Sequence, residues 1–598
     1  MKNTFRHILL AMCLSLFGLL QQANATTYYV DFNNGSDANN GLTQGTAWLN
    51  IPGTQNVTNT GVVSGATGWH SIAAGDTIKI KPGTTHDSSK GGLIKISSAN
   101  YALGATAANP ITITTDQTWA TGQAVINGTG TTVPSYWGLI TVYGVPGVVI
   151  DGGVTNGIMV ENSAYYNVLL YASSAGNTTV NWIVNNIQLY NSRSAGIITV
   201  QNGGDTNNYK MSNITFNNIN CDLTNGANDG EECIGVWDAD NVVVKNSTAS
   251  RGCNNSAGSC DGIHFGQVSH GLIDSCTVHD NWEQGIDISK DKKTTDNGYV
   301  TVRNCIAYNN FKDSYDTNSG NHDIYFINNI GWKTFETSVG DANFEVYETG
   351  YNVFFINNTS VNSYDTGFGF YWFDNANAYL PSGTQSNYMM NNVSYLDGYG
   401  NGSRSTGSNS VALDAPAYGW TNNVYGWNNN LASKVASSNS VISAGGTSLQ
   451  AASINTTTGG WYGKGNISSN PLYVNPSGTT WAVTDLTLQS ISPNKNAGVF
   501  PFTTSGAGSG TTINLTPLTS ALDARYVFFP GDKIQIQGGG TATVATVPSA
   551  TQIILTSSQT WASGAGIWYP WPNQKLDIGA MSAGTVGSVL LPAPTLKP

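Results

Sequence analysis

Ionisable side chains recur in five short, strand-like segments between residues 234 and 348. The segments read IGVWD, DGIHF, EQGIDIS, NFKDSYD and NFEVYE. Carboxylates and amides suit Ca²⁺, an oxygen-binding cation, better than Zn²⁺, which prefers His and Cys. A lysine that loses its proton beside such a site can act as a general base. The ionisable residues in these segments include Asp238, Asp261, His264, Glu283, Asp287, Lys312, Asp313 and Glu345.

The five segments belong to a series of imperfect repeats, each with a strand, a turn, a second strand and an Asn-rich turn. Intervals of 25 to 34 residues favour one coil of a parallel β-helix per repeat. A stacked Asn amide can donate to and accept from its neighbour one coil away, which satisfies it when buried. We therefore expect one buried ladder at Asn186, Asn218, Asn246, Ser275, Asn304, Asn329, Asn358 and Asn392.

The composition supports an all-β fold of this kind, a parallel β-helix, and the resemblance described below implies that it is right-handed. The chain has 598 residues, of which 40% are hydrophobic and only 10% are charged. A disordered chain would carry more charge, and a coiled coil would be rich in Ala, Glu, Lys, Leu and Arg. The net charge of −12 argues against nucleic acid as a partner, because phosphates require a basic surface.

The first 25 residues have the pattern of a signal peptide. Basic residues at positions 2 to 7 precede an apolar run at 8 to 20, and Ala-Asn-Ala at 23 to 25 fits cleavage. No segment is long enough for a membrane anchor. We expect a secreted protein, extracellular or periplasmic, in which oxidising conditions favour disulfides. Cys253–Cys260 is the bridge that we expect, and the spacing leaves the other pairings open.

The remaining chain divides into three parts. Residues 26–499 are assigned to the β-helix, including an N-terminal entry segment. Residues 500–571 have several short strands with Gly and Pro turns, which predicts a small inserted β-rich module. Residues 572–598 contain KLDIGAM, predicted as the final β-helix strand, and a tail. We expect a monomer.

Four motifs on successive coils resemble the core of family 9 polysaccharide lyases, the pectate-lyase-like β-helices. They are Cys260-Asp261-Gly262-Ile263, then Glu283-Gln284-Gly285-Ile286-Asp287, then Asn310-Phe311-Lys312, then Gly320-Asn321-His322. The detailed resemblance covers residues 260–334. Two features depart from the family pattern: an aspartate pair is Glu283-Gln284 here, and a Gly-rich turn is replaced by Asp313-Ser314-Tyr315-Asp316.

The resemblance implies site residues and a cofactor. It makes Asp261, Glu283, Gln284 and Asp287 the ligands of Ca²⁺, and Lys312 the catalytic base. We further expect four substrate contacts, at His264, Lys290, Tyr315 and Glu345. Six basic residues would form a local patch for an acidic polysaccharide: Lys290, Lys292, Lys293, Arg303, Lys312 and Lys333.

The expected reaction is β-elimination on a 4-linked uronate polymer, with pectate as the default substrate. Lys312 would remove the proton at C5, which a Ca²⁺-bound carboxylate makes more acidic. One alternative is a β-helix glycoside hydrolase that uses two carboxylates. The candidates for that pair are Glu231, Glu232, Asp238, Asp261, Glu283 and Asp287. A lyase on another acidic polysaccharide and a non-catalytic adhesion protein also remain open.

Overall fold

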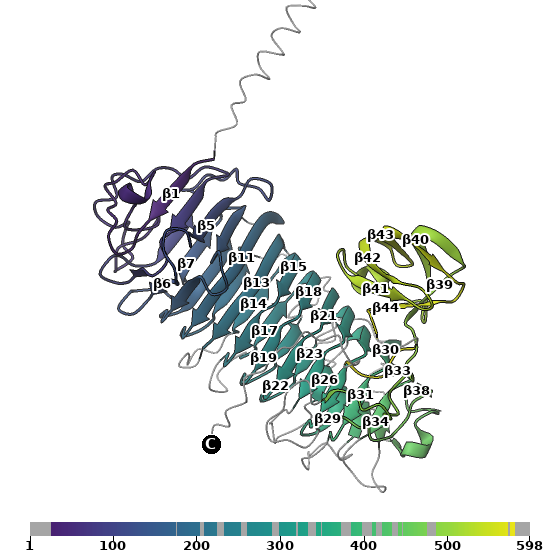
Figure 1. Cartoon of the computed structure of the whole chain (residues 1–598). Coiled ribbons are helices and arrows are strands. Elements are labelled where there is room, and N and C mark those ends of the chain that lie inside the picture. Colours follow the sequence, from purple (N-terminus) through teal and green to yellow (C-terminus); the bar gives the residue numbers. More distant parts are fainter. Residues whose placement is uncertain are drawn as a thin grey trace, which may run out of the picture.

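The chain winds into a right-handed parallel β-helix, and a small barrel projects from the side of its C-terminal half (Figure 1). No helix with the length and apolar character of a membrane span occurs in the ranges described. The computed structural model describes residues 25–174, 176–203, 209–223, 232–252, 260–289, 298–318, 321–332, 342–347, 350–371, 384–397, 409–413, 421–432, 441–444, 447–474, 486–571 and 575–580.

Each central coil contributes three strands to two sheets. In one coil, β17 (Ile263–Gly266) lies in the smaller sheet, and β18 (Ser269–Asp274) and β19 (Thr277–His279) lie in the larger sheet. Both sheets are almost entirely parallel, because each strand pairs with its equivalent in the next coil. We call the larger sheet, of 25 described strands, sheet A, and the smaller, of 13, sheet B.

The other strands of sheet B are β4 (Ile94–Ser97), β7 (Gly138–Tyr143), β10 (Tyr166–Ala172), β12 (Ile197–Gln201), β14 (Ile234–Trp237), β20 (Ile286–Ser289), β23 (Tyr315–Thr317), β26 (Ala342–Val346), β29 (Thr366–Phe370), β32 (Asn409–Leu413), β35 (Ile442–Ala444) and β36 (Thr447–Leu449). Short 3₁₀ turns occur at η1 (Gln44–Thr46), η2 (Ala451–Ser453) and η4 (Ala524–Tyr526).

The other strands of sheet A are β1 (Thr27–Val30), β2 (Thr77–Ile80), β3 (Thr85–His86), β5 (Ile111–Thr115), β6 (Ala124–Asn127), β8 (Val148–Asp151), β9 (Ile158–Glu161), β11 (Thr178–Tyr190), β13 (Met211–Asp222), β15 (Ala239–Lys245), β16 (Thr248–Ser250), β21 (Gly298–Arg303), β22 (Ile306–Tyr308), β24 (His322–Ile327), β25 (Ile330–Trp332), β27 (Tyr351–Ile356), β28 (Thr359–Val361), β30 (Thr384–Met390), β31 (Val393–Tyr395), β33 (Thr421–Trp427), β34 (Asn430–Ala432), β37 (Thr457–Thr458) and β38 (Trp461–Lys464).

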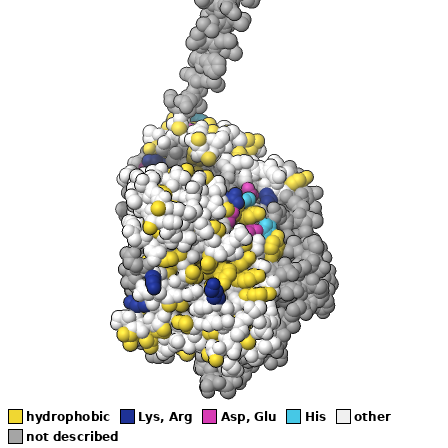
Figure 2. Space-filling model, turned by 90° about the vertical axis from the view of Figure 1, so that its right-hand side faces the viewer, with side chains coloured by type: hydrophobic (Ala, Val, Ile, Leu, Met, Phe, Trp, Pro, Cys, Tyr) yellow, Lys and Arg dark blue, Asp and Glu magenta, His cyan; other side chains and the backbone are white. Residues whose placement is uncertain are grey.

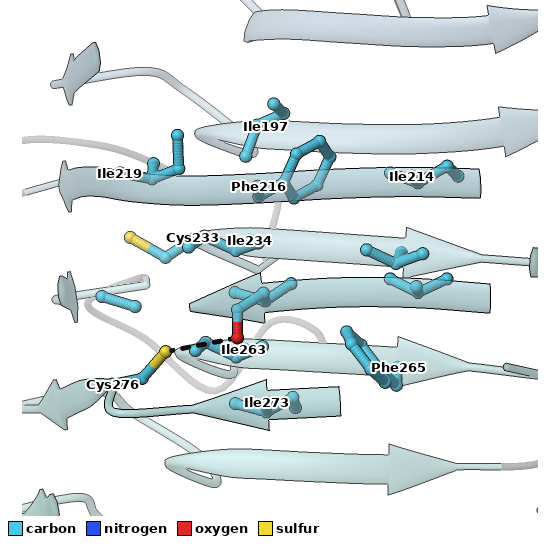
Figure 3. Close-up of a cluster of buried hydrophobic side chains, with 14 of the residues drawn as sticks. Ile197, Ile214, Phe216, Ile219, Cys233, Ile234, Ile263, Phe265, Ile273 and Cys276 are labelled. Carbon is cyan, nitrogen blue, oxygen red and sulfur yellow. Dashed lines mark hydrogen bonds between the residues drawn. The ribbon is translucent and has the colours of Figure 1, made fainter. Parts of the chain in front are cut away.

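The core fills the space between the sheets with side chains from alternate strand positions. Figure 3 shows Ile234 and Ile263 of sheet B in the same buried cluster as Ile214 and Phe216 of sheet A, all fully buried. Because equivalent positions stack coil upon coil, these side chains form continuous apolar columns. Each fully buried aliphatic side chain contributes about 1.5–3 kcal/mol relative to exposure. Because successive side chains of a strand point to opposite faces, the residues between these inward-facing positions point outward.

The asparagine register forms two neighbouring ladders, so the prediction of one buried ladder is wrong for its first five positions. Those positions, 186 to 304, lie at a bend of sheet A with φ between 52° and 57°. Asn tolerates this left-handed conformation better than most residues. In later coils Asn328, Asn357 and Asn391 occupy the bend. The alignment of the repeats within the chain does not reveal this shift by one residue.

The true buried ladder begins one residue after the bend. Its members are fully or almost fully buried, from Asn329 to Asn466. Asn358 Nδ2 donates to Asn392 Oδ1 at 3.1 Å, and the Asn329 backbone N–H donates to Asn358 Oδ1 at 2.9 Å. Each amide thus satisfies its neighbours. The ladder runs through Asn329, Asn358, Asn392, Asn429 and Asn466.

The cysteines lie in and beside the core. Cys221 and Cys233 form a disulfide. Cys260 is also disulfide-bonded, and Cys253, its expected partner, lies outside the described residues. Cys276 and Cys305 are buried free thiols on successive coils.

The C-terminal barrel packs against sheet A. Its strands are β39 (Phe502–Thr504), β40 (Gly508–Pro517), β41 (Lys533–Ile536), β42 (Thr541–Ser549), β43 (Gln552–Trp561) and β44 (Gly566–Trp568). Arg303 of β21 holds it, with Nη1 at 2.6 Å from Asp532 Oδ2. Figure 2 shows this side of the molecule, on which charged side chains are sparse and hydrophobic side chains form a band.

The segment after the barrel is not the predicted final strand. Its described part, residues 575–580, pairs with no sheet. Leu576 and Ile578 are buried, and the Gly579 N–H donates to the Asn391 carbonyl at 2.7 Å. The segment therefore covers the bend of sheet A and does not extend it. The predicted signal peptide, except Ala25, and the tail from residue 581 lie outside the described residues.

Candidate functional site

Four ionisable side chains stack in register on the outer face of sheet B. His264 of β17 pairs with Asp287 of β20, which pairs with Asp316 of β23, which pairs with Glu345 of β26. Neighbouring strands lie about 4.8 Å apart, so these side chains are immediate neighbours along the helix axis. All four are at most 5% exposed. We call them the outer column.

A second group of polar residues lies in the turns that precede these strands. Glu232 and Asp261 are almost fully buried there. Asp261 Oδ1 accepts from the Gln284 backbone N–H at 3.0 Å, and Asp313 Oδ1 accepts from the Ala342 N–H at 2.7 Å. These bonds fix the turns of successive coils to one another. Glu283, in the turn before β20, lies next to both groups. We call the carboxyl groups of the outer column, of the turns and of Glu283 the acidic cluster: Glu232, Asp261, Glu283, Asp287, Asp313, Asp316 and Glu345.

His264 lies in the middle of the acidic cluster. Its Nδ1 is 2.8 Å from Glu232 Oε1 and 3.3 Å from Asp261 Oδ2, and its Nε2 is 3.5 Å from Asp287 Oδ2. Burial alone would lower the pKa of His264, but the charge of Asp287 and bonds to Asp261 and Glu232 raise it well above 6.5. His264 is therefore a buried cation that neutralises part of the cluster.

Lys312 lies at the edge of the acidic cluster. Its Nζ is 2.5 Å from Glu283 Oε1, and the two side chains are 34% and 20% exposed. Burial raises the pKa of Glu283, Lys312 opposes this shift, and Asp261 adds to it. The amine thus lies beside the Glu283 carboxylate and is partly exposed to solvent.

The donors present fit a hard divalent cation. Burial, followed by the charges of Asp287 and Asp313, raises the pKa of Asp316 well above 3.8. Glu232 Oε2 and Asp316 Oδ1 are buried without a hydrogen-bond partner among the described residues. Glu232 and Asp261 place carboxylate oxygens within 4.8 Å of each other, whereas His264, as a cation, has no free nitrogen for a metal. Even with Asp316 protonated, six carboxylates against two cationic side chains leave a negative excess that Ca²⁺, with its oxygen ligands, would relieve.

The structure brings most of the predicted site residues together. Asp261, Glu283, Gln284, Asp287, His264, Glu345 and Lys312 all lie on adjacent coils at this face.

Two predicted residues do not join them, and four more lie outside the described residues. Tyr315 is wrong as a substrate contact, because it is fully buried in the core and its hydroxyl donates to the Ile330 carbonyl. Arg303 lies under the barrel, so it is not part of a basic patch at the site. Lys290 lies outside the described residues, as do Lys292, Lys293 and Lys333.

Sequence reasoning gave two members of the site no role in it. Asp316 appeared only as a departure from the family pattern, although it lies 29 residues after Asp287 and 29 before Glu345. That regular spacing is the signal that could have found it. Glu232 appeared only as a hydrolase candidate, and its turn gives no comparable signal.

Comparisons with known proteins show only distant similarity. No protein-family model matches the chain, and no curated protein matches it. It is similar to pectate lyase Pel9A, with 15% identity and a TM-score of 0.40 over 80% of this chain and 92% of that one. It is similar to XylC in complex with xylose, with 10% identity and a TM-score of 0.43 over 91% of this chain and 100% of that one. It is also similar to a rhamnogalacturonan lyase, with 12% identity and a TM-score of 0.35 over 79% of this chain and 96% of that one.

Proposed function

We propose that this protein is a secreted polysaccharide lyase that cleaves a 4-linked uronate polymer by β-elimination. One observation carries the proposal: the Lys312 amine lies beside a buried acidic cluster on the outer face of the β-helix, 2.5 Å from Glu283. The same face runs along the helix axis and can accept an extended chain. Pectate is the first substrate to test.

The carboxylates of the site would repel a uronate unless a cation lay between them. Asp261, Asp287 and Gln284 are the residues that would hold Ca²⁺, with Glu283 as a fourth ligand. When bound, Ca²⁺ would withdraw electron density from the uronate carboxylate and make the C5 proton more acidic. His264 supplies fixed positive charge within the cluster and orients Asp261 and Asp287 through its two ring nitrogens.

Lys312 acts as the base in this proposal. The Glu283 carboxylate accepts from its ammonium, so the resting amine is protonated. Loss of that proton leaves a lone pair on Nζ, which takes the C5 proton. The C4–oxygen bond then breaks with its electron pair on the leaving oxygen, which takes a proton from solvent water, and the other product carries a C4–C5 double bond. We therefore expect the rate to rise toward alkaline pH.

A glycoside hydrolase is the second candidate. The observation that favours it is the pairing of Asp316, whose pKa is raised, with Asp287 on the next strand. One protonated and one ionised carboxyl group are the acid and the base or nucleophile of glycosidases. This alternative gives Lys312 no role in the chemistry.

A panel of uronate polymers, with and without Ca²⁺, distinguishes the two. The lyase releases unsaturated, ultraviolet-absorbing ends and stops when a chelator removes Ca²⁺. Reducing ends that appear without that absorbance would overturn the lyase proposal and favour the hydrolase.

A further inference from the structure

A run of aromatic side chains covers the outer face of sheet B on its N-terminal coils. Trp137 stacks on Tyr143 with ring centroids 5.7 Å apart and planes within 3°. Tyr143 stacks on Tyr171, one coil further, at 5.1 Å. Tyr143 is 36% exposed, although aromatic side chains of this size are normally well covered. We call Trp137, Tyr143 and Tyr171 the aromatic platform.

Lys95 lies over the aromatic platform. Its Nζ is 4.7 Å from the centroid of Trp137 and 5.0 Å from that of Tyr143. Lys81, over the ring of Trp119, also pairs with Asp31 at 2.8 Å. No ion pair of Lys95 occurs among the described residues. Lys95 therefore offers a positive charge, held by rings, to an anion from outside.

Tyr136 borders the platform in a strained conformation. Its φ is +64°, which is rare for a bulky residue, and its side chain is 66% exposed. Its ring contacts Tyr165 at a centroid distance of 5.0 Å. Strain of this kind concentrates at ligand-binding sites.

The aromatic platform and the candidate site lie on the same sheet, sheet B. The position of Lys95 on β4 follows the register through Leu169 and Ile198 to His264, the first member of the outer column. Trp237 closes the apolar part of this path and contacts His264 at a centroid distance of 4.6 Å. The strand register thus places aromatic, apolar and acidic positions in order along one face of sheet B.

We propose that the aromatic platform is a distal binding site for the acidic polysaccharide, remote from the cleaved bond. Trp137, Tyr143 and Tyr171 stack on the apolar faces of pyranose rings, and Lys95 pairs with a uronate carboxylate. This inference rests on the proposed function for the identity of the polymer. Rings and cation together select a sugar that is both stackable and anionic.

The distance to the acidic cluster sets a length requirement. From β10 to β20 there are four steps between neighbouring strands of about 4.8 Å each, or about 19 Å. A chain must therefore span several sugar units to occupy both places. Long polymers gain affinity from the platform, whereas an oligomer of two or three units that fills the cleavage site does not.

Affinity electrophoresis measures this binding without any requirement for turnover. Gels contain polygalacturonate or, as a neutral 4-linked polymer, hydroxyethylcellulose. There are two variants. One is the double variant Tyr143→Ala/Tyr171→Ala, called the tyrosine variant, and the other is Lys95→Gln. The matched controls lie on β38 of sheet A, Tyr462→Ala and Lys464→Gln. Thermal unfolding shows whether each variant is folded, and Lys95→Gln changes only an outward side chain.

We expect polygalacturonate to retard the wild type, and the tyrosine variant to bind it about tenfold more weakly, because stacking area is lost. Lys95→Gln should weaken binding to polygalacturonate and not to the neutral polymer. Retardation equal to that of the wild type in both variants, or none for the wild type, would overturn the inference. Normal retardation without unsaturated products would instead overturn the lyase proposal alone.

Discussion

At the scale of single residues, the site depends on where one amine and one imidazole lie among many carboxylates. His264 is enclosed by Glu232, Asp261 and Asp287, while Lys312 remains at the edge and partly exposed. His264 contributes a positive charge that stabilises the neighbouring carboxylates, because those carboxylates keep it protonated. The exposed base can exchange its proton and reach a substrate.

Substitution of Lys312 tests its role as the base. Lys312→Gln should lower kcat by about 100- to 10,000-fold, the usual contribution of a general base. Lys312→Arg should be equally inactive, because it keeps the charge but does not lose its proton. Steady-state kinetics on polygalacturonate measures both. Substantial activity in the arginine variant would show that only the positive charge matters.

Asp397 gives a prediction about pH and stability. It is fully buried, and burial raises its pKa from 3.8 to about 7 despite bonds from Ser394 and the Ser363 N–H. The folded state therefore binds this proton more tightly than the unfolded state. Its contribution to stability is present below pH 3.8 and decreases as pH rises toward 7.

The isosteric variant Asp397→Asn removes this titration. We expect its melting temperature, relative to that of the wild type, to increase from pH 4 to pH 7.5. Differential scanning calorimetry at several pH values measures the difference. A constant difference across this range would mean that Asp397 is ionised throughout.

At the scale of the elements, each coil places residues more precisely than the sequence suggests. The period of the repeats and the outward positions of Asp261, Asp287 and Lys312 could be predicted, because strand alternation and coil length are local properties. The ladder shift at Asn328 could not, because shortening a coil from 29 to 24 residues before the bend looks the same as a shorter loop elsewhere.

Tyr315 was misassigned for a related reason. In the segment DSYDT, Tyr and Asp alternate, so a shift of one residue exchanges the buried and exposed faces. Tyr315 faces the core because its ring stacks on that of Phe344, with ring centroids 4.7 Å apart. Phe344 belongs to the neighbouring coil, so this contact is not visible in the segment itself. The same shift placed Asp316 outside, in the outer column.

The buried Asn ladder should be a major source of stability. Asn358→Ala removes the acceptor of the Asn329 N–H and the donor to Asn392. Each buried group left unpaired costs about 1–3 kcal/mol. We expect a loss of that order or more in urea unfolding. Asn328→Gly, at the bend where φ is +55°, is the control and should be almost neutral.

At the scale of the whole molecule, a buried ionic contact and an apolar cluster join the barrel to the β-helix. Arg303 is only 7% exposed and bonds to both Asp532 and Asp274. The inserted module was apparent from its composition, but this contact joins residues 229 apart and could not be predicted from the sequence. It lies on sheet A, away from the candidate site.

Removal of Arg303 should loosen the barrel and leave the chemistry intact. Arg303→Ala leaves two carboxylates without their partner, at a cost of about 3–5 kcal/mol. Arg525→Ala breaks the more exposed pair with Asp523 and should cost less than about 1 kcal/mol. Urea unfolding compares the two. Equal, small effects would show that apolar packing alone holds the barrel.

The masses of the products of a defined oligouronate test the central claim most directly. In an elimination, the two fragments together have the mass of the substrate, and one of them is unsaturated. We predict this result for the wild type with Ca²⁺ and none of it for Lys312→Gln. Fragments that together weigh one water more than the substrate would show hydrolysis and contradict the account.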